Sequence, residues 1–370
     1  RLNTPAMPDI PGIEDFEGIA FHSARWEHQH ELQGKRVAVI GTGCSATQFV
    51  PAIADQVGSI SVFQRTPNWL LPVEEYHQPV TPEELWCLDK IPFYGRWYRF
   101  FLFRARAMDG LLPFLYGEKD WQGQAGTVGP ANAEMRAAME EYIREQAGDD
   151  TALAQALIPD YPPGGKRPVL DDGSWISTLR RDNVALVTEG IERIEAGGIR
   201  TTDGTLHEAD VLIYGTGFHA QNFLSTLHIT GRDGRDLHQQ WQGDPQAHKG
   251  TTIPGFPNLY LLYGPNTNIV VGSSIVFFSE CEMRYIMGCL KLQFQQQLDS
   301  LEVREDVCVA YNQEIDALNQ MRAWGSPDVS SWYKNATGRV SQNWPGTQFE
   351  RWQQTREPNP ADFIEPIAGA

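Results

Sequence analysis

Hydrophobic positions form their clearest pattern near the start of the chain, where a strand, a helix and a second strand follow one another. Residues 35–40 are short, β-branched and end at a glycine, which is typical of a buried parallel strand. Residues 45–54 carry Phe49 and Ile53 at helical spacing, and residues 59–64 form a second apolar run. About 30 residues make up this unit, the size of a βαβ crossover, so the pattern predicts a parallel α/β domain.

The pattern changes twice further along the chain. Between Pro72 and Pro163 it becomes a series of helical segments rich in aromatic residues and arginine, such as residues 133–146, which we interpret as an insertion. Residues 1–32 have prolines and glycines but no sustained periodicity, which indicates a linker. Strands are predicted at 184–188, 198–202, 209–214 and 256–263, and a helix at 279–297.

Composition is that of a globular protein, because 41% of the 370 residues are hydrophobic and 21% are charged. A formal net charge of −17 argues against general nucleic-acid binding, which uses a basic face. The five cysteines are odd in number and form no CxxC pair, so we expect neither a disulfide framework nor a zinc site. We expect a cytoplasmic location for the same reason. Residues 91–116 are the most apolar stretch, but their arginines, Arg106 among them, make them too charged to span a bilayer. We therefore expect neither a metal site nor a membrane partner.

A glycine-rich motif joins the first predicted strand to the helix. Gly41 permits the tight turn, Gly43 lets a pyrophosphate approach the backbone, and the small Ala46 lets the helix pack closely on the strand. A glycine turn of some unrelated α/β protein is the alternative, but the strand before the motif and the helix after it favour dinucleotide binding. The cofactor-binding residues predicted here are Gly41, Thr42, Gly43, Cys44, Ser45, Ala46 and Gln48. No partner suited to a nucleophilic cysteine accompanies Cys44, which we interpret as a small loop residue.

Two basic stretches provide candidate partners for the phosphates. Arg65 and Thr66 follow the second strand, where an NAD site usually has an acidic residue for the ribose 2′-OH. A guanidinium and a hydroxyl suit a 2′-phosphate, so NADPH is expected, although a surface arginine at a strand end is the alternative. Lys166 and Arg167 stand in a turn fixed by glycine and proline, and are either cofactor ligands or a solvated basic turn. The segment 210–218 is a strand that ends in a glycine turn, which could lie close to a ligand or another domain.

At this point the sequence resembles the Baeyer–Villiger monooxygenases. The spacing of Phe16, Gly18, His22 and Trp26 matches the FxGxxxHxxx(W) fingerprint of that family, directly before the second dinucleotide motif. Further stretches of the same family follow in order at 63–67, 166–168, 210–218, 254–259 and 264–267. Residues 331–335, 343–345 and 272–274 look most like the 4-hydroxyacetophenone monooxygenase branch.

The resemblance implies an FAD- and NADPH-dependent enzyme that uses O2 to insert an oxygen next to a ketone carbonyl, giving an ester or lactone. Arg167 matches the family's active-site arginine, which would stabilise the oxygen anions that form during the reaction. Lys166, Arg65 and Thr66 match residues that hold the NADPH 2′-phosphate, and Trp332 matches a tryptophan that closes over the nicotinamide side.

Two other groups of residues receive roles from the same resemblance. Asn266 and Thr267 lie where the chain passes the flavin. His22 is expected to position the linker between domains, although acid–base chemistry or plain packing are alternatives, and His28 and His30 have no partners that would complete a metal site.

The fold class expected from the resemblance is α/β. It combines a Rossmann-like NADP-binding domain, which has a helical insertion, with the C-terminal part of a discontinuous FAD-binding Rossmann-like domain. The expected limits are a linker at 1–32, the NADP-binding domain at 33–72 and 164–217, the insertion at 73–163 and the FAD-binding part at 218–370. The family's first dinucleotide motif does not occur in the sequence, so the N-terminal FAD-binding segment is expected to be missing. Alternatives left open are a flavin N- or S-oxygenase and an inactive NADP-binding fragment, and neither the ketone nor the oligomeric state is predicted.

Overall fold

The computed structural model describes residues 2–73, 76–104, 110–272 and 274–364. Two compact units divide the chain. The first unit comprises Arg1–Pro79, Met135–Asp160 and Arg167–Ala220, and the second comprises Val80–Glu134, Tyr161–Lys166 and Gln221–Ala370. Ser273 in the 272–274 stretch and Arg106 in the apolar stretch lie outside the described residues. Residues 135–160, which the sequence assigned to the insertion, are counted with the first unit; the domain limits themselves stay a prediction.

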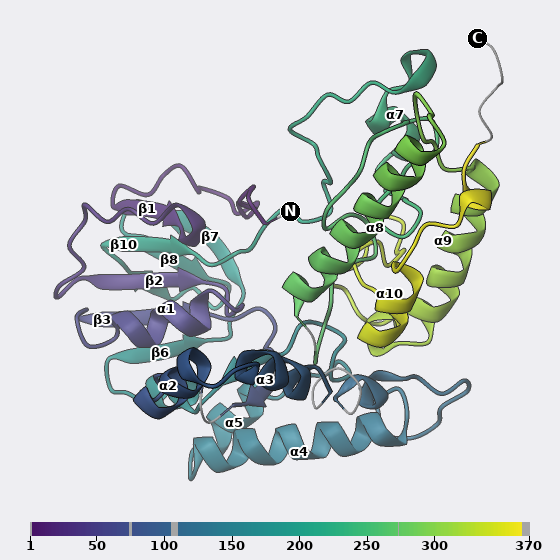
Figure 1. Ribbon diagram of the computed structural model, residues 1–370. Helices are drawn as coiled ribbons and strands as arrows, with labels where there is room; N and C mark the ends of the chain where they lie inside the picture. The colour runs from purple at the N-terminus through teal and green to yellow at the C-terminus, as the bar shows by residue number, and fades with distance from the viewer. Residues whose placement is uncertain (1, 74–75, 105–109, 273, 365–370) are drawn as a thin grey trace. The chain divides into compact units, whose positions relative to one another are not determined.

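A five-stranded parallel sheet forms the centre of the first unit (Figure 1). Its spatial order is β1–β10–β2–β3–β6, so the chain returns from β6 to insert β10 between β1 and β2. The strands are β1 (Ile19–His22), β10 (Val211–Tyr214), β2 (Arg36–Ile40), β3 (Ser59–Phe63) and β6 (Val184–Val187). This parallel α/β arrangement is Rossmann-like, as the sequence predicted.

The sheet is apolar on both faces, which explains why its strands are continuous hydrophobic runs. A three-stranded antiparallel sheet packs on it through Ile194 and Ile199, which share a buried cluster with Ala38 and Leu212 of the parallel sheet. The antiparallel strands are β7 (Ile191–Glu195), β8 (Gly198–Thr201) and β9 (Leu206–Glu208). Helices counted wholly with this unit are α1 (Ala46–Ile53), α5 (Thr151–Leu157) and α6 (Ser174–Leu179).

A short parallel pair marks where the insertion leaves and rejoins the first unit. It consists of β4 (Leu70–Pro72) and β5 (Val169–Asp171). Between them, α4 (Pro130–Ala147) begins among residues counted with the second unit and ends among residues counted with the first.

The second unit is helical over its described residues. Its helices are α2 (Pro82–Lys90), α3 (Tyr94–Phe103), α7 (Leu237–Trp241), α8 (Ile275–Gln295), α9 (Glu305–Gln320) and α10 (Gln348–Gln354). Short 3₁₀ turns are η1 (Ser23–Arg25) in the first unit and η3 (Leu112–Leu115), η4 (Arg232–Gly234), η5 (Ala323–Gly325) and η6 (Pro360–Asp362) in the second. One core of this unit packs Tyr285 and Cys289 of α8 against Leu301, Val303 and Phe363.

Most of the predicted elements are confirmed, to within a few residues at their ends. They are the strands at 35–40, 59–64, 184–188, 198–202 and 209–214 and the helices at 45–54, 133–146 and 279–297.

The strand predicted at 256–263 is wrong. The chain forms turns there, with one isolated bridge from Tyr260 to Thr252. Pro257 has no N–H to donate to a sheet, and Asn258 and Tyr263 adopt left-handed φ angles of 59° and 56°. The apolar residues that suggested a strand, Phe256 and Leu261, pack instead into a cluster with Trp241.

Candidate functional site

The glycine loop between β2 and α1 has the shape that a phosphate-binding loop requires. Gly41 adopts a φ of 104°, and a Cβ atom on it would lie 2.7 Å from the carbonyl oxygen of Gly215. Gly43 has no heavy atom within 4 Å of the position its Cβ would take. The first glycine is therefore needed for the turn and for close backbone packing, while the second leaves open space beside the backbone where a pyrophosphate would fit.

Gly215 belongs to the glycine turn that the sequence predicted after the 210–214 strand. Its amide donates to the carbonyl of Ile40 at 2.9 Å, directly before the phosphate loop. A Cβ on Gly215 would lie 3.5 Å from the Cβ of Ala46. The turn after β10 thus approaches the phosphate loop, and the small side chain at Ala46 keeps the two segments close.

The first turn of α1 begins directly after the phosphate loop, where the Thr47 amide donates to the Gly43 carbonyl at 3.1 Å. Ser45 precedes the helix and makes no side-chain capping hydrogen bond, so the N-terminal amides are not satisfied by its hydroxyl. The side chains of Thr47 and Gln48 both donate to the Cys44 carbonyl, at 3.3 Å and 2.6 Å. The Gln48 side chain therefore stabilises the loop through the Cys44 carbonyl. Its direct contact with a cofactor stays a prediction.

Asn68 holds the loop to the end of β3, a role that the sequence analysis missed. Its side-chain amide donates to the Thr42 carbonyl at 2.6 Å, and the Thr42 hydroxyl donates to the Thr66 carbonyl at 3.5 Å. Gly41 also donates its amide to the Phe63 carbonyl at 2.9 Å. The segment that contains Arg65 and Thr66 is consequently fastened beside the phosphate loop. Asparagine's frequency in turns was the only sequence signal for Asn68.

Arg65 extends from the protein surface at this end of the sheet. It is exposed, whereas the preceding Gln64 is buried and donates its side-chain amide to the Ala156 carbonyl at 2.8 Å. The alternation of strand side chains thus turns Gln64 inward and leaves Arg65 available at the edge. Its position suits a phosphate that is bound in solvent contact.

Arg167 reaches the same phosphate loop from a distant part of the sequence. Burial raises the pKa of the Cys44 thiol, and the Arg167 guanidinium opposes that rise through its charge and a hydrogen bond. The thiol keeps its proton at neutral pH, which agrees with the interpretation of Cys44 as a loop residue. Arg167 therefore lies at the loop to which the segment of Arg65 and Thr66 is fastened, and the binding of a dinucleotide by the two arginines stays a prediction.

Lys166 is counted with the second unit, whereas its neighbour in sequence, Arg167, is counted with the first. Its ammonium group stands 4.6 Å from the centre of the Tyr161 ring. Gly164, two residues earlier, has a φ of 78°, so the turn that carries the two cations depends on glycine. The position of Lys166 relative to the phosphate loop stays a prediction.

The fingerprint residues fix an edge strand that the sequence analysis had placed in a linker. Gly18 must be glycine, because a Cβ there would lie 2.6 Å from both the Asp210 carbonyl oxygen and the Phe16 ring. β1 then pairs with β10, and Trp26 packs edge-on against Phe21 and against Phe49 of α1, with centroid distances of 5.2 Å and 5.3 Å. The fingerprint therefore ties the start of the chain to the sheet and to the helix of the phosphate loop.

His22 ends this strand and is almost fully buried. Its Nδ1 accepts a hydrogen bond from the Ala24 amide at 3.1 Å, and its ring packs edge-on against Phe218. Burial lowers the pKa of His22, and the Gly217 backbone partly offsets this effect. A neutral, packed ring of this kind suits a structural role.

Asn266 and Thr267 lie in the second unit, where their side chains bind other parts of the protein. The Asn266 amide donates to the carbonyls of Val340 and Asn343 at 2.7 Å and 3.2 Å, and the Thr267 hydroxyl donates to the Gly264 carbonyl at 2.8 Å. Both residues are buried. They shape the backbone of this segment, and their contact with a flavin stays a prediction.

Trp332 is partly buried in the second unit. Its ring centre lies 4.6 Å from that of Tyr333, and its carbonyl accepts a hydrogen bond from the Gln221 side chain at 3.4 Å. Its contact with a nicotinamide stays a prediction.

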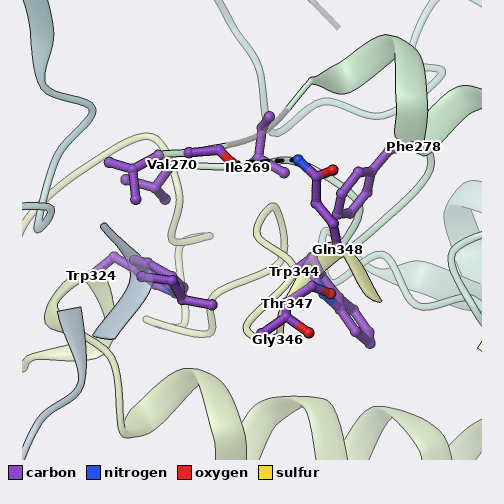
Figure 2. A pocket seen from close by; sticks show the side chains of 11 residues that line it. Ile269, Val270, Phe278, Trp324, Trp344, Gly346, Thr347 and Gln348 are labelled. Carbon is purple, nitrogen blue, oxygen red and sulfur yellow. Dashed lines mark hydrogen bonds between the residues drawn. The ribbon is translucent and has the colours of Figure 1, made fainter. Parts of the chain in front are cut away.

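A small apolar pocket of the second unit lies between residues 269–272 and residues 344–348. Figure 2 shows Trp324 and Trp344 facing Ile269 and Val270 across it. The cavity measures only about 20 Å³, so it has room for about one water molecule rather than for a ketone. The part of the chain that the structure describes contains no group of three or more metal-ligating side chains and no helix long and apolar enough to cross a bilayer.

Comparison with known proteins decides the family. Residues 3–80 match the flavin-binding monooxygenase-like (FMO-like) family. A Baeyer–Villiger monooxygenase of Streptomyces coelicolor is 33% identical over 366 residues, which cover 98% of this chain and 67% of that protein. The chain belongs to the FMO-like flavin monooxygenase family. Its homologues also include a Baeyer–Villiger monooxygenase of Pseudomonas aeruginosa, 37% identical over 359 residues that cover 96% of this FMO-like chain and 64% of the relative.

A solved structure supports the fold of this FMO-like chain. The OTEMO complex with FAD and NADP superimposes with a TM-score of 0.78 at 26% identity, covering 96% of this chain and 71% of that one. The FMO-like chain spans about half to two thirds of the length of the curated relatives that it matches.

Proposed function

We propose that the first unit binds NADPH. The loop from Gly41 to Ala46 would hold the pyrophosphate at the N-terminus of α1, and Arg65 with Thr66 would bind the 2′-phosphate. Lys166 would add a second cation to that phosphate. Three observations support this proposal: the open space beside Gly43, the start of α1 directly after the loop without a side-chain cap at Ser45, and the hydrogen bonds that hold the Thr66 segment at the loop.

FAD is the second proposed cofactor. Support comes from the FMO-like family and from OTEMO, whose solved structure contains FAD and NADP. The backbone at Asn266 and Thr267 would pass the flavin, and Trp332 would close over the nicotinamide. Residues 218–370 would accordingly belong to an FAD-binding domain. The sequence features at 331–335 and 343–345 favour the 4-hydroxyacetophenone monooxygenase branch within this family.

The proposed reaction is the NADPH- and O2-dependent insertion of one oxygen next to a ketone carbonyl, giving an ester or lactone. When bound, the flavin supplies the activation of O2, with reducing electrons that come from NADPH. Arg167 is the residue of this chain that would act at the reacting atoms. Its guanidinium is already positioned at Cys44 beside the phosphate loop, so it can stabilise negative charge on oxygen without a prior rearrangement.

A single observation carries this proposal: Arg167, from the segment after the insertion, meets the phosphate loop that follows β2. The substrates favoured are aryl or other hydrophobic ketones, and the proposed location is the cytoplasm. The test supplies the protein with FAD, NADPH and O2 and analyses the products formed from an aryl ketone and an aryl sulfide in parallel. Ester from the ketone is expected, and Arg167→Ala should abolish it.

Two results would contradict the proposal. Exclusive formation of sulfoxide would identify an S-oxygenase instead. Ester formation that Arg167→Ala leaves unchanged would remove that residue from the chemistry. NADPH binding, measured separately by the quenching of tryptophan fluorescence, distinguishes a failure of catalysis from a failure of the nucleotide site.

A further inference from the structure

Helix α3 has one face that is fixed to the rest of the second unit. Arg99 forms an ion pair with Glu280, and the Phe103 ring lies 5.1 Å from the Phe277 ring. Arg99 and Phe103 are four residues apart and therefore lie on one side of the helix, and both partners belong to α8. The orientation of α3 on α8 is thereby set.

The side of α3 turned away from Arg99 and Phe103 carries the exposed aromatic side chains of Trp97 and Phe101, which are 70% and 63% exposed. Phe93 at the N-cap is 64% exposed, and Phe100, on the flank that also lines the groove described below, is 53% exposed. At typical side-chain areas these four residues present roughly 400 Å² of apolar surface, comparable to the largest patch on an ordinary monomer. Such a patch on one helix indicates a surface that is covered by a partner.

The charges around this face indicate what the partner is. Residues 94–104 contain three arginines and no acidic residue, although the whole chain has a net charge of −17; one of the three, Arg99, is paired with Glu280. The Arg96 guanidinium stands 5.5 Å from the centre of the Phe93 ring, at the border of the aromatic face. A negatively charged surface would be repelled by the net charge of the chain but attracted by Arg96 at this face. Aromatic residues bordered by arginines are typical of helices that lie in the interface of an anionic bilayer.

A groove within the second unit continues the apolar surface of α3. It lies between α3, the start of α8, and α10, and it measures about 390 Å³. Its lining residues are Arg96, Arg99, Phe100, Phe103, Phe277, Phe349 and Trp352. An aromatic groove with arginines beside it suits an acyl chain whose anionic headgroup stays at the surface.

We propose that α3 docks the protein on the surface of an anionic lipid bilayer. The helix lies parallel to the membrane plane, with Trp97 and Phe101 in the headgroup–acyl boundary and Arg96 at the lipid phosphates. A ten-residue helix is too short to span a bilayer, but an interfacial helix does not need to span one. The sequence-based expectation that no membrane is a partner considered only spanning segments.

The test measures co-sedimentation of the full chain with vesicles of phosphatidylcholine alone and of phosphatidylcholine mixed with phosphatidylglycerol. Binding is expected only to the anionic vesicles and should weaken as salt is added. The double variant Trp97→Ser/Phe101→Ser should lose affinity for the anionic vesicles by about tenfold or more. Phe294→Ser, at a side chain of α8 that is 78% exposed, is the matched control and should bind like the original protein.

A charge pair of variants completes the experiment. Arg96→Glu should lose affinity for anionic vesicles, whereas Lys291→Glu on the exposed surface of α8 should lose much less. Circular dichroism verifies that each variant is folded. Trp97→Phe keeps an apolar side chain, so it should still sediment while showing less quenching of tryptophan fluorescence by brominated lipid.

Three outcomes would overturn the proposal. The first is that the protein does not sediment with any vesicle. The second is that the control Phe294→Ser loses as much binding as the double variant. The third is that light scattering detects a dimer and that the double variant Trp97→Ser/Phe101→Ser dissociates it, which would assign the face to a second copy of the chain. None of these measurements depends on catalytic activity, so their results are independent of the proposed oxygenase function.

Discussion

The side-chain amide of Asn68 lies 2.6 Å from the carbonyl oxygen of Thr42, and this hydrogen bond joins the phosphate loop to the segment after β3. The two halves of the proposed NADPH site, the loop for the pyrophosphate and Arg65 for the 2′-phosphate, are held in register by this contact. Preorganisation of this kind reduces the ordering that a ligand must impose on binding.

Asn68→Ala should weaken NADPH binding about tenfold, because the loop is no longer fixed and the lost hydrogen bond costs about 1 kcal/mol of stability. Fluorescence titration with NADPH and thermal unfolding measure the two effects. Asn183→Ala is the matched control, because the Asn183 amide donates to the Ala54 carbonyl at 2.9 Å in the same unit. It should lose similar stability and leave NADPH affinity unchanged, and equal losses of affinity in both variants would contradict the role assigned to Asn68.

Two glycines of the loop should respond differently to the same substitution. Gly41→Ala should destabilise the protein by about 1–3 kcal/mol, because the residue has a φ of 104° and its methyl group would meet the Gly215 carbonyl oxygen. Gly43→Ala should fold normally and lose NADPH affinity, because its methyl group meets no protein atom and occupies the space proposed for the pyrophosphate. Denaturant unfolding and NADPH titration of both variants test this contrast; a Gly43→Ala protein that binds NADPH normally would exclude the site.

Arg65→Ala should reduce affinity for NADPH about 10–100-fold and leave affinity for NADH nearly unchanged, because only NADPH carries the 2′-phosphate. The ratio of the two dissociation constants is the quantity to measure. Arg193→Ala, at a basic residue of β7 in the antiparallel sheet, serves as the control and should not alter the ratio. Parallel losses for both nucleotides would indicate a general electrostatic effect.

The contact between Arg167 and Cys44 can be tested without any activity measurement. Arg167→Met removes a cation that lowers the thiol pKa, so the pKa of Cys44 should rise further and its thiolate fraction at a given pH should fall. Alkylation of the Cys44 peptide, followed by mass spectrometry across a pH series, should therefore be slower in the variant. The Cys87 peptide of the second unit provides the internal reference, and unchanged Cys44 kinetics would contradict the contact.

His248 should make the protein sensitive to acid. Burial, reinforced by the nearby Lys249, lowers the pKa of His248 to about 4, and Asp362 opposes the shift only in part. Between pH 6.5 and about 4 the unfolded chain binds a proton at this residue that the folded chain does not, so stability should decrease as pH falls through that window. His248→Gln should show a shallower decrease in melting temperature over the same range, and identical pH profiles would disprove this origin.

Local patterns allowed much of the first unit to be predicted. The phosphate loop was found because its requirements, a strand, three small residues at fixed spacing and a helix, are all contained in residues 35–54. The strand β1 was not predicted, because its four residues have no distinctive period and pair with Val211–Tyr214, far along the chain. The erroneous strand at 256–263 shows the same limit, since an apolar run can pack as turns when Pro257 and Asn258 interrupt it.

The site was predicted less completely than the fold, for a related reason. Arg65 and Arg167 could be proposed from motifs, but the hydrogen bonds of Asn68 and the close approach of Gly215 depend on where distant segments meet. The side chains of Asn266 and Gln48 bind carbonyl groups of the protein, which no pattern of residue types indicated.

The position of β1 has a consequence for anyone who shortens this chain. β1 occupies one end of the five-stranded sheet and uses the hydrogen-bonding groups of β10 on that side. A version that starts at Lys35 would leave Val211–Tyr214 as an unpaired apolar edge strand, to which a strand of another molecule could add. Trimming the first 34 residues should therefore yield a protein that associates through its sheets rather than a smaller nucleotide-binding domain.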